Sequence, residues 1–355
     1  MGIATLAHAE LYCPDLEASL EHFRDTMGMY VSHEEDDAYY LAAYGDWQDY
    51  TLILREGEDW GCRHVAWMLE DEDDFEEFER RIEESGYDTE WVEESDEPGQ
   101  GSALRFDYPG DAPEYFELVY DIDRGFDTVA EEDRSRLKNQ PRKKPERGAG
   151  LRRIDHVNFN VPNVAECTEW FQDVLGFKLR EEGIDPEGNQ AGTWLSVSPL
   201  VHEIAFVRAP PDANVNGKID HVAYYMDGGQ AGELERAADL LRERGIEMVG
   251  GPARHGISQA HFNYYLEPSG NKVEIFAGGY LIFDPDWEPI TWTPEDGSDG
   301  FVWWGGKAGS HARRQYDYIP TDETDWSDQG GEHLHCRPLR ERHQKQEPEP
   351  AEADD

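Results

Sequence analysis

The sequence repeats one short pattern four times, and this repetition constrains the fold more than any other feature. Each copy begins with an apolar, strand-like run that contains a histidine, and then shows apolar residues at spacings of three and four. Such spacings place the apolar side chains on one face of a helix. A glycine follows each helical pattern, where helices commonly end. The histidine-containing runs are residues 6–11, 63–68, 154–159 and 219–224.

Short apolar or alternating runs follow each predicted helix, so the repeated unit is a strand, a helix and then several strands. We therefore predict an α+β fold of four βαβββ modules that pair into two domains. The predicted N-terminal domain covers residues 1–122, and the predicted C-terminal domain covers residues 151–310. Residues 123–150 form the predicted linker, whose basic cluster at 142–147 is interpreted as solvated rather than as a phosphate site. Residues 311–355 form an acidic tail that is predicted to be disordered.

The charge excludes several classes of partner. There are 32 Lys and Arg against 78 Asp and Glu, which gives a net charge of -46 and disfavours nucleic acid or an anionic membrane as a partner. The chain is still 38% hydrophobic, enough for a large core, and its acidic excess runs through periodic regions such as 70–84. Because molar salt shortens the Debye length to about 3 Å, this composition is typical of a halophile cytoplasm.

Other features favour a cytoplasmic protein. No apolar run reaches the roughly 18 residues that a membrane span requires, and the N-terminus lacks the pattern of a secretory signal. The cysteines are far apart and form no CxxC pair, which indicates free thiols in a reducing compartment and neither a disulfide framework nor a zinc site. They are Cys13, Cys62, Cys167 and Cys336.

Three residues of the C-terminal half form a candidate metal site. His156 and His221 occupy corresponding positions in the third and fourth repeats, and Glu274 lies on the last predicted strand of the fourth. A single histidine on a strand is more often structural. Two imidazoles and one carboxylate together suit a divalent first-row metal, and with open coordination positions they favour non-haem Fe(II).

Two segments resemble a known family. Residues 251–256 and 264–276 are similar to the signature of extradiol ring-cleaving dioxygenases, and most similar to the catechol 2,3-dioxygenase type within the vicinal oxygen chelate superfamily. The resemblance extends over roughly residues 3–310. It continues through the segments 155–157, 201–206, 220–222 and 289–292.

The resemblance implies a reaction and a role for each residue. His156, His221 and Glu274 would hold Fe(II), or alternatively Mn(II), with positions left for a catechol and O2. His202 matches the acid–base histidine of the family, while His255 and Tyr264 match a pair that hydrogen-bonds the substrate hydroxyl. The expected reaction cleaves catechol or a substituted catechol to a 2-hydroxymuconic semialdehyde. The resemblance also suggests a homo-oligomer, either a tetramer or a dimer.

The N-terminal half repeats the ligand pattern but not the proton-transfer residues. It carries His8, His64 and Glu117 at similar spacings, and this set is interpreted as a relic of duplication or, alternatively, as a second metal site. In this half, counting along the sequence puts different residue types at the equivalent positions. Tyr50 corresponds to His202, Asp107 to Tyr264 and Pro98 to His255. A further group in the tail offers only a weak metal pattern: His333, His335 and Cys336.

Two alternative functions stay open from the sequence. A glyoxalase-like lyase or isomerase of the same superfamily would normally need a fourth protein ligand for Zn or Ni, and it gives no role to His255 and Tyr264 together. A non-enzymatic binding protein of the antibiotic-resistance type would need no metal triad. Tightly bound metal would therefore argue against the binding protein.

Overall fold

The computed structural model describes residues 2–94, 96–109, 115–209, 219–227, 231–246 and 248–305. The predicted tail, including His333, His335 and Cys336, lies outside these residues. Cys13, Cys62 and Cys167 are buried, and none of these three described cysteines takes part in a disulfide. Within the described ranges, the structure contains no helix that is both long and apolar enough to cross a membrane.

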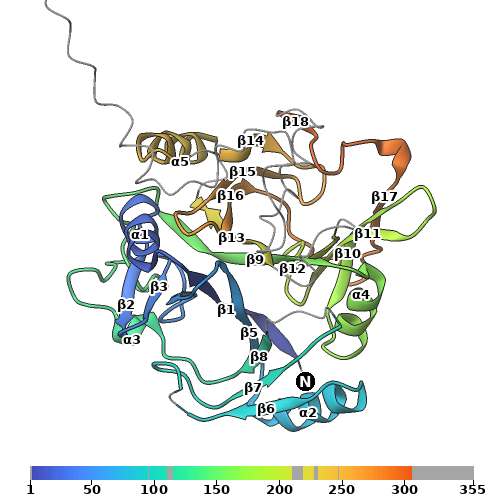
Figure 1. Ribbon diagram of the computed structural model, residues 1–355, viewed down its shortest axis with the longest axis horizontal. Helices are drawn as coiled ribbons and strands as arrows, with labels where there is room; N and C mark the ends of the chain where they lie inside the picture. The colour runs from blue at the N-terminus through green and yellow to red at the C-terminus, as the bar shows by residue number, and fades with distance from the viewer. Residues whose placement is uncertain are drawn as a thin grey trace, which may run out of the picture.

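The N-terminal half forms an eight-stranded sheet from two modules (Figure 1). The first module consists of β1 (Ile3–Cys13), α1 (Leu16–Glu21), β2 (Tyr30–Glu34), β3 (Ala38–Ala42) and β4 (Leu52–Glu56). The second consists of β5 (Gly61–Leu69), α2 (Phe75–Glu84), β6 (Thr89–Val92), β7 (Ala103–Phe106) and β8 (Tyr115–Val119). The strand order is β2-β3-β4-β1-β5-β8-β7-β6.

The C-terminal half repeats this arrangement. Its modules consist of β9 (Leu151–Val161), α4 (Val164–Asp173), β10 (Lys178–Ile184), β11 (Gln190–Ser196) and β12 (Ile204–Arg208), then β13 (Ile219–Met226), α5 (Ala231–Glu243), β14 (Met248–Arg254), β15 (Ala260–Leu266) and β16 (Lys272–Gly278). Two short strands that the sequence did not predict extend the edges of this sheet, β17 (Ile290–Trp292) beside β10 and β18 (Trp304–Gly305) beside β14.

The same pairing rule explains both sheets. The last strand of each module returns parallel to the first, as β4 does to β1 and β16 does to β13. Two first strands then pair antiparallel at the centre, β1 with β5 and β9 with β13. The prediction of four βαβββ modules in an α+β fold is confirmed. The pairing also places the four histidine-bearing strands at the centres of the two sheets.

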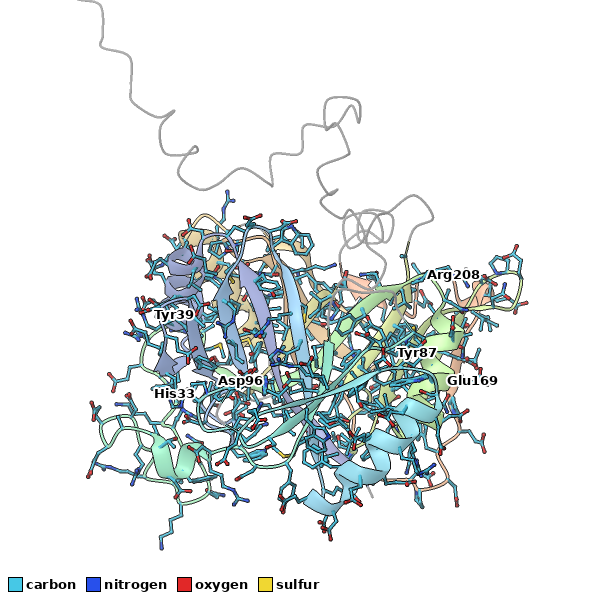
Figure 2. All side chains as sticks on the ribbon, turned by 60° about the horizontal axis from the view of Figure 1, so that its bottom comes forward. His33, Tyr39, Tyr87, Asp96, Glu169 and Arg208 are labelled. Atoms are coloured by element: carbon cyan, nitrogen blue, oxygen red, sulfur yellow. The ribbon has the colours of Figure 1, made fainter. Side chains whose placement is uncertain are left out.

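The two halves share one continuous hydrophobic core. The ring of Trp67 packs 5.0 Å from that of Phe177, centroid to centroid, and Phe116 packs 5.4 Å from Phe159. The second module lies against the third, and Figure 2 shows Tyr87 near α4, where it contacts Trp170. The first module lies against the fourth, with α1 and α5 on the same side in Figure 1. Each half therefore supports the other.

The segment between the sheets differs from the solvated linker that we predicted. It contains a short helix, α3 (Gly125–Thr128), and Arg142 from its basic cluster is 1% exposed. The Arg142 guanidinium donates hydrogen bonds to the backbone carbonyls of Asp46, Gln48 and Asp49, at 3.2, 3.2 and 2.6 Å. These carbonyls belong to a turn whose acceptors would otherwise be buried without donors, which explains why one basic residue is drawn inside.

Candidate active site

The three predicted ligands lie on three neighbouring strands, β9, β13 and β16. His156 and Glu274 are both register partners of Ala223, and His221 lies two residues before Ala223 on β13. Residues in register share a face, and so do residues two apart on a strand. The sheet itself therefore places His156, His221 and Glu274 together on one face.

The distances between the ligand atoms fit a metal ion. Oε2 of Glu274 lies 3.1 Å from Nε2 of His156 and 3.1 Å from Nε2 of His221, and the two nitrogens are 3.4 Å apart. Metal–ligand bonds of about 2.2 Å at right angles would separate neighbouring ligand atoms by about 3.1 Å. His156, His221 and Glu274 could therefore act as three neighbouring ligands of one metal ion.

The electrostatics of the triad keep its carboxylate ionised. Burial alone would raise the pKa of Glu274, but hydrogen bonds and charge from His156 and His221 hold it well below its usual value. Burial opposes protonation of His156, yet the neighbouring carboxylates of Asp155 and Glu274 raise its pKa to about 9. A divalent cation among these groups would take the place of those protons, because metal ligands bind in their deprotonated forms.

Each of the two candidate ligand histidines, His156 and His221, follows an aspartate. Nδ1 of His221 lies 2.7 Å from Oδ2 of Asp220, and this contact orients the ring with Nε2 toward Glu274 and His156, where a cation could bind. The other Asp220 oxygen accepts from the Lys272 ammonium at 2.6 Å, and that cation lowers the pKa of the buried Asp220 to about 2. Oδ1 of Asp155 lies farther from Nδ1 of His156, at 3.6 Å. Both aspartates belong to Asp-His-Val segments that carry the family resemblance, but the sequence predicted no role for them.

We expect Asp220→Asn to weaken metal retention by about 10–100-fold, because a neutral amide holds the His221 ring less firmly and makes it less basic. Metal titration of the apo-protein measures this loss. Asp155→Asn is the matched control and should have a smaller effect, since Asp155 pairs with Arg153 at 2.8 Å and is beyond hydrogen-bonding distance of His156. Equal losses in the two variants would contradict this role for Asp220.

His202 lies beside the triad, just before β12. Its ring centroid is 4.0 Å from that of His156, and the residue is 8% exposed. Burial first, and then the neighbouring His156, lower the pKa of His202 well below its usual value. The neutral imidazole is thereby favoured. The structure brings this predicted residue to the metal ligands without including it among them.

His255 and Tyr264 form a hydrogen-bonded pair on the other side of the triad. Tyr264 is the register partner of Glu274, so it shares the ligand face, and its hydroxyl lies 3.2 Å from Nε2 of His255. Nδ1 of His255 bonds the carbonyl oxygen of Phe301. Since a carbonyl only accepts, Nδ1 carries the proton, and Nε2 can accept from the tyrosine. The ring of His255 also stacks on Phe262 at 3.7 Å.

The loop after His255 is held in an unusual conformation. Ser258 has a φ of 56°, and a side chain at Gly256 would collide with the Asp299 carbonyl oxygen at 2.4 Å. The buried carboxylate of Glu181 accepts from the Ser258 amide at 2.7 Å and from the Trp292 indole at 2.7 Å. It thereby fixes both this loop and the segment that leads to β18. The sequence pattern gave no signal for this contact.

All six predicted site residues line one open cavity of about 410 Å³. Its lining combines the candidate metal ligands and other polar groups with apolar and aromatic side chains. Such a combination is typical of a pocket for a small, largely apolar ligand that carries a few polar groups. The remaining lining residues are Asn158, Trp194, Val207, Ile257, Ser258 and Phe301.

Comparison with known proteins identifies the family. The sequence model of the Glyoxalase/Bleomycin resistance protein/Dioxygenase superfamily matches residues 5–103 and 153–275. The chain belongs to this superfamily. It is 42% identical over 305 residues to a manganese-dependent 2,3-dihydroxybiphenyl 1,2-dioxygenase of Geobacillus genomosp. 3, which covers 85% of this chain and 94% of that protein.

Other superfamily relatives point to the same branch. The chain is 37% identical over 305 residues to a metapyrocatechase of Geobacillus stearothermophilus, covering 85% of this chain and 90% of that protein. The crystal structure of the 2,3-dioxygenase LapB from Pseudomonas sp. KL28 matches with a TM-score of 0.74 and 28% identity, over 83% of this chain and 99% of that one. The predicted enzyme class, an extradiol ring-cleaving dioxygenase, is confirmed.

The N-terminal half of this superfamily member gathers a second set of ligand-type residues. His8, His64 and Glu117 come together as the C-terminal triad does, and Glu97 joins them. Counting along the sequence was wrong about one position: the register partner of Glu117 is Arg105, not Asp107. Because the β7–β8 connection is longer than the β15–β16 connection, a count of ten residues back from Glu117 stops just short of β7 (Ala103–Phe106).

Proposed function

We propose that this enzyme cleaves the ring of a catechol or substituted catechol beside its diol, with Fe(II) or Mn(II) held by His156, His221 and Glu274. Bound there, the metal ion would supply the acidity that ionises the diol and an electronic link between the ring and O2. The observation that carries the proposal is that one cavity combines a three-residue cluster that could hold a metal ion with His202, His255 and Tyr264. The manganese-dependent relative supports including Mn(II).

The protein groups divide the remaining work. Trp194 and Phe301 offer aromatic surface on which a ring can pack, while Val207 and Ile257 exclude water. The Tyr264–His255 pair can hydrogen-bond a diol oxygen and so fix the orientation of the ring. His202, on the other side of the triad, can accept a proton and return it as the ring opens. Both atoms of one O2 end in the product, a 2-hydroxymuconic semialdehyde or its substituted form.

The chemistry of the site disfavours the lyase alternative. Among the described residues of the C-terminal half, the group that can hold a metal has three members, His156, His221 and Glu274. A further histidine of this cavity, His255, has its Nε2 3.8 Å from Glu274, and its ring nitrogens contact Tyr264 and Phe301. A Zn or Ni lyase that needs four protein ligands would lack the fourth one here.

The test is oxygen uptake in a medium that suits the charge of the chain. Protein reconstituted with Fe(II), and separately with Mn(II), should consume one O2 per catechol in molar salt and form a yellow ring-opened product. Catechol, 2,3-dihydroxybiphenyl and 3,4-dihydroxyphenylacetate are suitable substrates for comparing kcat/KM. Absence of uptake with every catechol, in folded protein that carries metal at the C-terminal triad, would overturn the proposal.

A further inference from the structure

The N-terminal sheet gathers its own ligand-type residues at the centre. His8 on β1 and Glu117 on β8 are both register partners of Ala66, and His64 lies two residues before Ala66 on β5. The register is therefore the one that assembles the C-terminal triad. Glu97 enters from the loop after β6, and this carboxylate supplies a fourth donor.

The four side chains meet at ligand distances. Nε2 of His8 lies 2.9 Å from Nε2 of His64 and 3.3 Å from Oε2 of Glu97. Nε2 of His64 lies 3.3 Å from Oε1 of Glu97 and 3.8 Å from Oε2 of Glu117. Four ligands at about 2.0–2.1 Å around a tetrahedral ion would be separated by about 3.3 Å. The observed separations lie on both sides of that value.

The cluster is fully buried and leaves acceptors without donors. Each of its four residues is 0–1% exposed. Within the described residues, Oε1 of Glu97 and Oε2 of Glu117 have no hydrogen-bond partner, although both lie close to His64. Buried carboxylate oxygens without a donor are costly, and a cation between them and the two imidazoles would satisfy them all at once.

Neighbouring side chains orient the residues of the cluster through hydrogen bonds and ion pairs, as the residues behind the ligands do in metal sites. Oε2 of Glu10 lies 2.8 Å from Nδ1 of His64, so it can orient that ring with Nε2 toward the cluster. Glu10 is itself neutralised by Arg63 at 2.8 Å and by Arg55. The Tyr50 hydroxyl donates to Glu97 at 3.2 Å, and Arg105 holds the second oxygen of Glu117.

We propose that His8, His64, Glu97 and Glu117 bind a second divalent metal ion, which stabilises the N-terminal sheet and takes no part in ring cleavage. Four nitrogen and oxygen ligands, all buried, match a closed structural site, and Zn²⁺ is the first-row ion that this set fits best. The position of His202 carries Tyr50 here, and that of Tyr264 carries Arg105. This site is therefore independent of the proposed function.

The competing explanation is a cluster without metal. A protonated His64 together with Arg105 could then balance Glu97 and Glu117, since those carboxylates raise the pKa of His64 to about 9 despite its burial. The two explanations differ in metal content, which can be counted one site at a time.

The experiment uses the untagged full chain with the C-terminal site removed by His156→Ala, after Zn²⁺ loading and removal of loose metal. Elemental analysis should find one zinc per chain, and zinc absorption spectroscopy should show nitrogen and oxygen neighbours that include two imidazoles. Adding Glu97→Gln should remove this zinc. Adding His33→Asn, a histidine of the same sheet that lies outside the cluster, should leave it bound.

A stability measurement covers the case in which the Glu97→Gln chain does not fold. Prolonged chelation of the His156→Ala protein should lower its Tm, and Zn²⁺ alone should restore the Tm. Any one of three results would overturn the proposal. The His156→Ala protein could contain no zinc either as isolated or after loading, or zinc could persist in a folded chain that also carries Glu97→Gln. The third such result is a Tm that chelation leaves unchanged.

Discussion

Replacing His156 with alanine is expected to abolish ring cleavage and to empty the C-terminal metal site. The loss should exceed the about 10–100-fold cost of removing an outer partner of a ligand, because a direct ligand is lost. It also leaves Glu274 with one imidazole neighbour instead of two, at 3.1 Å from His221. The checks are kcat/KM with catechol and a metal content one ion per chain below that of the parent protein.

His33→Asn is the control for this variant. His33 pairs with Asp49 in the N-terminal half and touches neither cluster of metal-ligand residues, so its replacement should leave both turnover and metal content near the parent values. Figure 2 shows His33 at the edge of that half. A His156→Ala enzyme that still cleaved catechol at the parent rate would contradict the assignment and would move the catalytic metal to the N-terminal cluster.

The predicted site residues whose proximity follows from the sequence pattern are those carried by strands. His156 and His221 occupy the same position in two copies of one module, and a module that pairs through its first strands must bring those positions together at the centre of a sheet. Glu274 and Tyr264 follow from the parallel return strand and its antiparallel neighbour. Period-two alternation does the rest, because it decides which face each residue occupies.

The residues whose roles could not be predicted from the sequence are positioned by loops and by contacts between distant parts of the chain. Glu97 lies one position before Pro98, where counting had predicted the counterpart of His255, and no periodicity passes through that loop. The Glu181 carboxylate accepts hydrogen bonds from Ser258 and Trp292, which lie 77 and 111 positions farther along the chain. Arg142 was expected in solvent because basic clusters usually are, and only the tertiary fold creates the ring of carbonyls that buries it. Oligomeric state and salt adaptation stay predictions.

The many surface carboxylates and the few buried carboxylates of the two clusters differ in how strongly salt screens their interactions. Surface carboxylates interact through solvent and are screened by salt, whereas Glu274, Glu97 and Glu117 are at most 2% exposed and interact with fixed partners at short distance. Salt should therefore change the stability of the chain as a whole more than the interactions within the two clusters.

We expect His202→Gln to lower kcat by about 10²–10⁴-fold while the metal content stays at the parent value. His202 borders the triad at 4.0 Å, ring centroid to ring centroid from His156, without supplying a ligand atom, so its loss removes a proton acceptor and leaves the metal in place. Glutamine keeps similar bulk and some hydrogen bonding, but it cannot take up a proton near neutral pH. The measurements are kcat, KM and bound metal on the same preparation.

The pattern of changes separates proton transfer from packing. His261→Asn is the control, because His261 lies on β15 beside Trp304, outside the cavity lining, and its replacement should leave kcat unchanged. If His202 only packed against His156, the glutamine variant would lose metal and turnover together, and metal added in excess would restore both. A lower kcat at full metal content, with KM little changed, instead requires that His202 act on the bound substrate during the reaction, where a proton must move as the ring opens.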